Sequence, residues 1–333
     1  KALPASNKAS MSITGIAIIN AMAENERGEL VDPYGGARDL DAHLLRHVSP
    51  AFSEDPVRIL RVARFAARYH HLGFTVAEDT LALMRDMVAS GEVDHLVPER
   101  VWKEMERALG ERDPQVFIQC LRDCGALARV LPEVDALFGV PQRPEHHPEV
   151  DTGVHCLMVL EQAAQLTEDT RVRFAALIHD LGKGVTPTEE WPRHIDHEQR
   201  SLPLVDALCE RITAPKDYRR LARLAAEYHT HGHRALELKP STILKLLKAA
   251  DAFRKPVQFE QFLLCCEADA RGRTGFEDRD YPQADYLRGA LKACQAIDNR
   301  EIAAQGHTGK AFGEALDRER LARLSEFKAS RAF

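Results

Sequence analysis

Hydrophobic residues recur every three or four positions through most of the chain beyond Met11, which is the spacing of the buried face of an α-helix. Five stretches show it clearly: VRILRVARFAARY (57–69), DTLALMRDMVAS (79–90), ERVWKEMERAL (99–109), VFIQCLRDCGAL (116–127) and HCLMVLEQAAQL (155–166). Strand patterns are scarce and occur only near Ile13–Ala23 and at Gly28–Val31. The sequence therefore predicts a mainly α-helical protein with a small α/β edge at its N-terminal end.

Length and composition narrow the class of protein. A chain of 333 residues can form about two domains, and the proline- and histidine-rich segment Pro141–Asp151 is the best boundary between them. The net charge of −6 offers no bulk attraction to nucleic acid. Seven scattered cysteines indicate reduced thiols, and the apolar patch near the start is too short to span a membrane. We expect a cytoplasmic protein with no membrane contact.

The stretch FAALIHDLGKG (174–184) places a titratable pair at the end of an apolar run. Phe174, Leu177, Ile178 and Leu181 have the spacing of one buried helix face, and Gly182 supplies a helix stop. His179 and Asp180 therefore point away from that face, towards the wall of a site. Alternatively, His179 merely caps the helix and Asp180 binds a neighbouring arginine.

Further metal-type ligands lie on or next to other predicted helices. They are His155, Asp269 and the run EYHTHGH with His229, His231 and His233. Imidazole and carboxylate suit a borderline divalent ion, and the lack of cysteine among them argues against a structural zinc knuckle. We expect the three histidines of the run on the surface or in supporting positions, with His194 and His197 at the mouth of the site.

The pattern H…HD…D resembles the HD phosphohydrolase superfamily. This resemblance implies that His155, His179, Asp180 and Asp269 bind a divalent ion of the nickel, manganese or cobalt type. His179 and Asp180 would then carry the catalysis, with Lys183 meeting a phosphate oxygen. The implied reaction is attack of activated water on phosphate monoesters or 2′,3′-cyclic phosphates, with Arg271 also steadying the developing charge.

A second cluster is SEDPVRILRVARFAARYHHLGF, in which Arg58, Arg61, Arg64 and Arg68 share one helix face. Alone, this is a solvated face with Glu54 paired to Arg58. With INAMA, GELVDPYGGARDL and LLRHVSP before it, the segment resembles the bacterial class II CCA-adding tRNA nucleotidyltransferases that end in an HD domain. The resemblance covers Asn20 to about Arg279.

That resemblance implies roles and partners. Asp55, Arg58 and Arg61 would read the incoming nucleotide, because an acceptor beside a guanidinium can pair with the shared edge of CTP and ATP. The substrates would be tRNA 3′ ends, CTP and ATP, with magnesium for nucleotidyl transfer. The implied segments are a remnant of the catalytic head (1–48), a helical neck and body (49–145), the HD domain (146–275) and a C-terminal helical tail (276–333).

The resemblance is incomplete at the start of the chain. Gly35-Gly36-Ala37-Arg38 and Asp39-Leu40-Asp41 mimic the family's catalytic signatures but stand where the family has its post-catalytic turn and helix. Most of the catalytic head therefore looks absent, and nucleotidyl transfer by these 333 residues is doubtful. Two rivals stay open: a non-catalytic tRNA-binding module, and a stand-alone HD hydrolase of free nucleotides.

Overall fold

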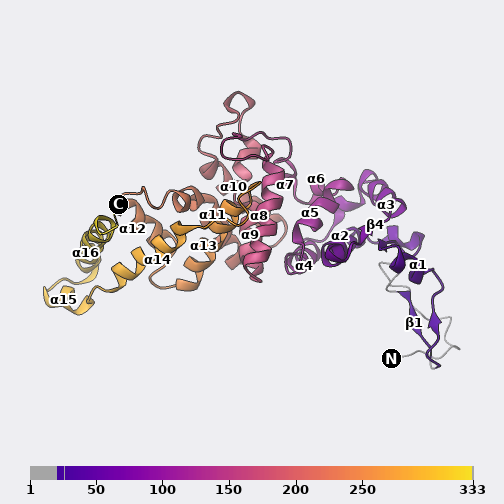
Figure 1. Cartoon of the computed structure of the whole chain (residues 1–333), viewed down its shortest axis with the longest axis horizontal. Coiled ribbons are helices and arrows are strands. Elements are labelled where there is room, and N and C mark those ends of the chain that lie inside the picture. Colours follow the sequence, from indigo (N-terminus) through magenta and orange to yellow (C-terminus); the bar gives the residue numbers. More distant parts are fainter. Residues whose placement is uncertain (1–20, 26, 332–333) are drawn as a thin grey trace.

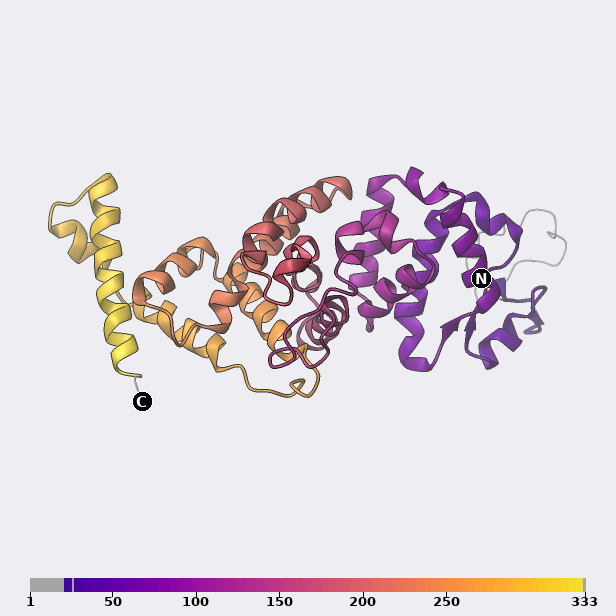
Figure 2. The same cartoon turned by 90° about the horizontal axis from the view of Figure 1, so that it is seen from above.

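The computed structural model describes residues 21–25 and 27–331. They form an elongated row of helices, with the N-terminal elements at one end and the C-terminal helices at the other (Figures 1 and 2). The prediction of a mainly α-helical fold is confirmed. No helix among the described residues is long and apolar enough to cross a membrane.

The strands are few and short. β1 (Ala23–Glu24) pairs antiparallel with β2 (Leu30–Val31), and β3 (Leu44–Leu45) pairs parallel with β4 (Thr75–Val76). The strand expected at Gly28–Val31 is thus present in its second half. The strand expected at Ile13–Ala23 falls outside the described residues except for its last positions, of which Ala23 lies in β1.

Helix α1 and the body follow. The elements are α1 (Gly36–Asp41), η2 (Pro50–Glu54), α2 (Val57–Tyr69), η3 (His70–Leu72), α3 (Glu78–Ala89), η4 (Glu92–His95), α4 (Pro98–Leu109), α5 (Pro114–Asp123), α6 (Leu127–Val130) and α7 (Pro132–Asp135). The apolar face of α2 packs against α4 and α5, because Ile59, Leu60 and Ala63 of its predicted stripe are fully buried. The predicted stretches 57–69, 79–90, 99–109 and 116–127 are confirmed as helices, with ends shifted by a few residues.

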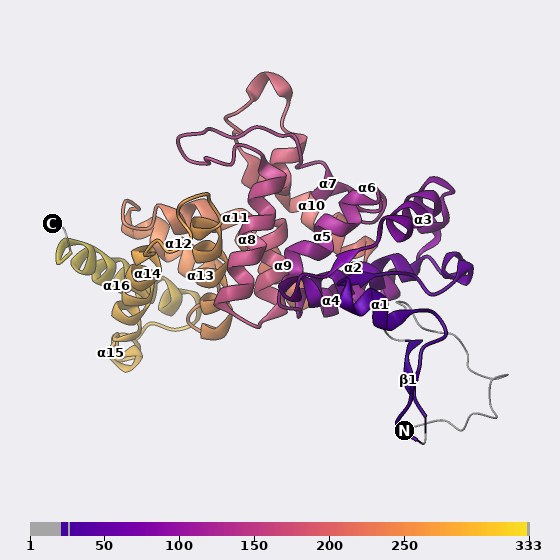
Figure 3. The same ribbon diagram turned by 45° about the vertical axis from the view of Figure 1, so that its right-hand side comes forward.

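A second bundle occupies the middle of the molecule. Its elements are α8 (Thr152–Leu166), α9 (Thr170–Ile178), η5 (Leu181–Val185), η6 (Thr188–Glu190), α10 (His197–Arg211), α11 (Lys216–His233), α12 (Pro240–Ala249) and α13 (Pro256–Arg271). α9 runs through its centre and packs against α8, α11 and α13 (Figure 3). The tail comprises α14 (Pro282–Gln295), α15 (Asn299–Ala304) and α16 (Gly309–Ala329), with α16 packed on α12 and α14.

A buried arginine joins the body to the middle bundle. Arg173 of α9 is 4% exposed and donates to four backbone carbonyls, those of Leu109, Glu111, Ala164 and Thr167. These oxygens lie at the C-terminal ends of α4 and α8, where helix dipoles favour a cation. Trp102 of α4 also meets Phe174 and Tyr218 edge to face, with ring centroids 5.5 Å and 4.7 Å apart.

The segment Pro141–Asp151 lies between α7 and α8, where a boundary is predicted, and its two ends form a β-bridge. The main cluster of buried side chains extends from the body into the middle bundle and tail. The body and the bundle therefore share a core, and the segment limits at 48, 145 and 275 stay predictions.

Candidate metal centre and nucleotide-reading helix

The His179-Asp180 pair lies just beyond the end of α9. The helix ends at Ile178, four residues before the predicted stop. Gly182 has no left-handed backbone; instead, a Cβ there would lie 2.0 Å from the carbonyl oxygen of His197. A hydrogen atom at this position lets η5 pack directly on α10, and this contact brings His197 next to Asp180.

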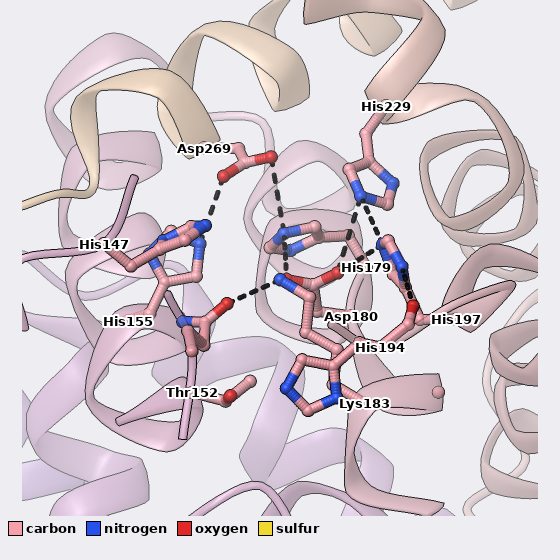
Figure 4. Close-up of polar contacts among 12 residues, drawn as sticks. His147, Thr152, His155, His179, Asp180, Lys183, His194, His197, His229 and Asp269 are labelled. Carbon is pink, nitrogen blue, oxygen red and sulfur yellow. Dashed lines mark hydrogen bonds and ion pairs between the residues drawn. The ribbon is translucent and has the colours of Figure 1, made fainter. Parts of the chain in front are cut away.

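The four predicted metal ligands converge (Figure 4). His155 Nε2 lies 3.1 Å from Asp269 Oδ1, and His179 Nε2 lies 3.2 Å from Asp180 Oδ2 and 3.5 Å from Asp269 Oδ2. All four residues are at most 3% exposed. Two of these separations lie in the range of about 3.0–3.4 Å expected for ligands that share one ion with bonds of about 2.1 Å. Ligand atoms of His155, His179 and Asp180 form one close group, and those of His179, His229 and Asp269 form another.

Two histidines that the sequence analysis left outside the ligand set complete a second group. His197 Nε2 and His229 Nε2 each lie 3.4 Å from Asp180 Oδ1 and 3.2 Å from each other. The surface position expected for His229 is wrong, since this residue is 3% exposed and faces Asp180. The supporting role stays a prediction. The spacing of His229 within EYHTHGH does not predict this position, because only the packing of α10 against α11 brings the rings of His197 and His229 together.

Hydrogen bonds fix which ring nitrogen faces the centre. In four imidazoles Nδ1 lies 2.7–3.0 Å from a backbone carbonyl oxygen: His155 from Gly272, His179 from Ala176, His197 from His194, and His229 from Ala225. A carbonyl only accepts, so Nδ1 carries the proton, and in the neutral ring Nε2 presents a lone pair to the centre. Nitrogen lone pairs thus converge with carboxylate oxygens, an arrangement that suits a cation.

The charges are strongly coupled. Burial opposes a charge on His179, but Asp180 and Asp269 outweigh it and raise its pKa to about 9. Burial would raise the pKa of Asp180, yet His179 and Lys183 hold it well below its usual value. Burial lowers the pKa of His229 well below its ordinary value, which leaves that ring neutral. The buried carboxylates therefore stay ionised and hold a positive charge beside them.

Side chains around the predicted metal ligands hold these ligands in their orientation. Glu149 Oε1 lies 3.0 Å from His147 Nδ1 and 3.1 Å from His155 Nδ1. His233 Nε2 donates to Asp269 over 2.6 Å, while its Nδ1 lies 3.1 Å from the hydroxyl of Tyr281. Carboxylates behind metal-binding histidines fix ring orientation and increase ligand basicity. His231 does not line the cavity, so the run EYHTHGH contributes two inward residues and one peripheral one.

The basic residues behave differently from each other. Lys183 Nζ lies 2.6 Å from Asp180 Oδ2 and lines the same cavity. Arg271 pairs with Glu267 and donates to the carbonyl of Arg279, so it does not reach the cavity, and its expected role is corrected. Arg273, two residues on, lines the cavity instead. The capping alternative holds for His179, which ends α9. Asp180 pairs with histidines and Lys183, and with no arginine among the described ion pairs.

The predicted nucleotide-reading residues lie at the start of α2. Asp55 Oδ2 accepts a 2.7 Å bond from Arg100, while the guanidinium of Arg58 donates to the carbonyl of Ala51. Arg61 pairs with buried Glu104 at 3.2 Å. An Asp55–Arg58 pair is thus not formed in this structure, and the alternative Glu54–Arg58 pair is also absent from the described ion pairs.

Asp55 instead faces a surface groove. Its lining includes Glu54, Glu92, His95 and Arg100 as well as Asp55. Burial would raise the pKa of the Asp55 carboxyl, but Arg100 and the Val57 amide outweigh it and lower it. The segment Asp39-Leu40-Asp41 lies on α1, where Asp39 is buried against Arg46 and Asp41 is exposed, so the two carboxylates do not share a ligand site.

Two family models match parts of the chain. The HD domain matches residues 152–255, and the probable RNA and SrmB-binding site of polymerase A matches residues 73–138. The multifunctional CCA protein of Thioalkalivibrio sulfidiphilus is 64% identical over 311 residues, which cover 93% of this chain and 76% of that protein. The chain belongs to the multifunctional CCA protein family. The resemblance seen in the sequence is thereby confirmed.

Other members give the same result. The multifunctional CCA protein of Hahella chejuensis is 60% identical over 94% of this chain and 74% of its own length. The family is one of tRNA-processing enzymes that add CCA and carry an HD domain. This chain spans about three quarters of the length of these relatives.

Solved structures share the fold. A CCA-adding enzyme with CTP aligns with a TM-score of 0.61 at 20% identity, covering 92% of this chain and 66% of that one. The Thermotoga maritima CCA-adding enzyme complexed with tRNA aligns with a TM-score of 0.56 at 19% identity, covering 95% and 72%. At this identity the likeness shows the fold alone.

Proposed function

We propose that the middle bundle hydrolyses phosphate esters at RNA 3′ ends, as monoesters or 2′,3′-cyclic phosphates, in a protein whose family adds CCA to tRNA. The carrying observation is the convergence of imidazole Nε2 atoms on Asp180, whose Oδ1 is buried without a hydrogen-bond donor among the described residues. A purely tRNA-binding module has no use for such a cluster, because buried acceptors facing each other are costly without a cation.

His155, His179, Asp180 and Asp269 would hold one divalent ion of the nickel, manganese or cobalt type. Asp180, His197 and His229 offer a second set of ligand atoms, all within 4.8 Å of one another. When bound, such ions activate water and draw charge from phosphate oxygens. The chain itself supplies orientation: Glu149 and the backbone carbonyls fix the rings, His233 fixes Asp269, and Lys183 holds Asp180 while meeting the phosphate.

The test is release of phosphate from a generic ester, and opening of a 2′,3′-cyclic nucleotide, by chelator-stripped protein supplied with nickel, manganese or cobalt. We expect activity only with metal. A preference for an RNA end over a free mononucleotide would separate this function from that of a stand-alone nucleotide hydrolase.

The second proposed activity is base reading for CCA addition from CTP and ATP, with magnesium in the catalytic head. It is supported by the groove beside Asp55 and by the tRNA-, CTP- and ATP-bound relatives of the same fold. Asp55 would exchange Arg100 for the base, with Arg58 as the donor beside it. Arg61 would act by holding α2 against α4 through Glu104.

In a protein that carries the complete catalytic head, Arg58→Ala should lose CTP and ATP incorporation together, because both bases present the same edge. Incorporation of labelled CTP and ATP into tRNA lacking its end measures this. Loss of one nucleotide only would show that Arg58 does not read the shared edge.

A further inference from the structure

The cavity beside Asp180 has donors that the cation-binding cluster does not use. Its volume is about 170 Å³, and its lining includes Gln142, Arg143, Lys183, Arg193 and Arg273. Gln142 is 3% exposed and Lys183 is 8% exposed. A buried glutamine in a cavity whose lining includes four cations suits an anionic ligand. The sequence analysis assigned no role to Gln142.

The orientation of the Gln142 amide follows from its neighbour. Lys183 Nζ lies 2.6 Å from Gln142 Oε1. An ammonium only donates, so the amide oxygen must face it, and the NH₂ group must face the other way. Gln142 Nε2 is buried and has no hydrogen-bond partner in the described part of the chain. An unpaired buried amide donor is costly, which argues for a ligand there.

The backbone holds this side chain in place. The amide of Gln142 donates to the carbonyl of Val150 over 2.7 Å, and the neighbouring Pro141 forms a β-bridge with Asp151 at the start of α8. His194 Nε2 donates to the carbonyl of Pro141 over 2.8 Å. Position 142 is therefore fixed by contacts on two sides and does not belong to a freely moving loop.

Arg273 supplies a second unused donor. Its Nη2 lies 3.5 Å from Asp269 Oδ1, and its Nη1 donates weakly to the carbonyl of His146 over 3.4 Å. Its Nε is buried and has no partner among the described atoms. Lys183 uses two of its three N–H groups, for Asp180 and Gln142, and keeps one.

We propose that Gln142 and Arg273 position the non-bridging oxygens of the substrate phosphate, with the third N–H of Lys183 beside them. This subsite rests on the proposed hydrolase function and defines its ligand class as a terminal or cyclic phosphate. Lys183 and Arg273 would supply positive charge and Gln142 a neutral N–H donor, and together they would hold the oxygens of one phosphoryl group. Gln142 and Arg273 would bind the phosphoryl oxygens directly and would take no part in proton transfer.

Gln142 could instead only support Lys183, without binding phosphate, and a substitution distinguishes this bracing role from the proposed subsite. Gln142→Glu keeps an acceptor for Lys183, replaces the NH₂ donors by a carboxylate oxygen and adds one negative charge. A bracing role predicts a loss of phosphate binding no larger than that in His146→Glu, which adds the same charge at an exposed position of the cavity lining. The subsite predicts a larger loss in Gln142→Glu, because a donor to the phosphate is removed as well. Gln258→Glu is the matched control, since Gln258 is also buried but donates to the carbonyl of Ala250, away from the cavity.

The experiment is calorimetric titration of inorganic phosphate into metal-loaded full chain, with metal content measured in each variant. A hydrogen bond to a charged group corresponds to roughly tenfold or more in affinity. We expect Gln142→Glu and Arg273→Gln to weaken phosphate binding at least tenfold with metal content unchanged, and Gln258→Glu to bind as wild type.

A loss of phosphate affinity in Gln142→Glu no larger than that in His146→Glu, or a loss that merely follows a loss of metal, overturns the subsite. The proposed hydrolase activity is tested independently of the subsite. If the wild type binds phosphate through Gln142 but hydrolyses no ester, the subsite is supported and the proposed reaction is refuted.

Discussion

At the scale of single residues, the proposed chemistry depends on Asp180. Its two oxygens face different groups, Oδ2 towards His179 and Lys183 and Oδ1 towards His197 and His229. One carboxylate therefore joins two sets of imidazoles, and each set can contribute ligands to an ion. The cluster lies where the end of α9 meets α10 and α11, so three helices must be in register for it to form.

His229 and His231 offer a matched pair of substitutions on one helix. His229→Ala should lower metal-dependent ester hydrolysis by tenfold or more, because it removes a lone pair 3.4 Å from Asp180. His231→Ala should retain activity close to wild type, because His231 does not line the cavity. Initial rates at saturating metal measure both. Equal rates for the two variants would place His229 outside the working site.

At the scale of elements, the contact of η5 with α10 positions the cluster. Gly182→Ala would drive a methyl group against the His197 carbonyl, 2.0 Å from the ideal Cβ position, and push α10 away from Asp180. We expect this variant to lose hydrolysis and some stability. Gly313→Ala on α16 should leave hydrolysis unchanged and stabilise the protein slightly, because a Cβ there meets nothing within 4 Å and alanine favours the helix. Activity and thermal unfolding of the two variants provide the test, and a fully active Gly182→Ala would refute the packing argument.

The positions of the helices were the feature of this protein that the sequence predicted best. The stripes at 57–69 and 155–166 gave nearly correct helices, because burial of one face is encoded locally, as in α2 and α8. His155, His179, Asp180 and Asp269 were predicted through the H…HD…D pattern. His197 was expected only at the mouth of the site and His229 on the surface or in support, whereas both lie beside Asp180, because helices distant in sequence pack together there. Gly182 was predicted as a helix stop, whereas its actual role is close approach of two segments.

At the scale of the whole molecule, the body and the middle bundle share one core. Arg173 connects the C-terminal ends of α4 and α8 through four carbonyls, and no carboxylate neutralises it among the described ion pairs. The body, which includes the proposed base-reading helix, and the His/Asp cluster are thus joined by a buried charge and an aromatic cluster. This is consistent with one enzyme in which the same RNA end can be extended or trimmed.

Removing that connection should weaken the whole protein. Arg173→Leu leaves buried carbonyls without a donor, and we expect a loss of about 3 kcal/mol or more in unfolding free energy. Arg220→Leu, at an exposed position of α11, should change it by less than about 0.5 kcal/mol. Urea unfolding followed by circular dichroism measures both. A stability loss for Arg173→Leu no larger than that for Arg220→Leu would mean that the two parts do not depend on this contact.

The most direct test of the account is metal-dependent hydrolysis by wild type and by Asp180→Asn. An amide is an uncharged, poorer ligand of nearly the same shape, so the variant should stay folded while losing a ligand shared by both imidazole sets. Chelator-stripped protein is supplied with nickel, manganese or cobalt, and phosphate release and cyclic-phosphate opening are followed. The account predicts activity in wild type with metal and none in Asp180→Asn. A wild type that is inactive with every metal, or an Asp180→Asn variant that is fully active, would contradict it.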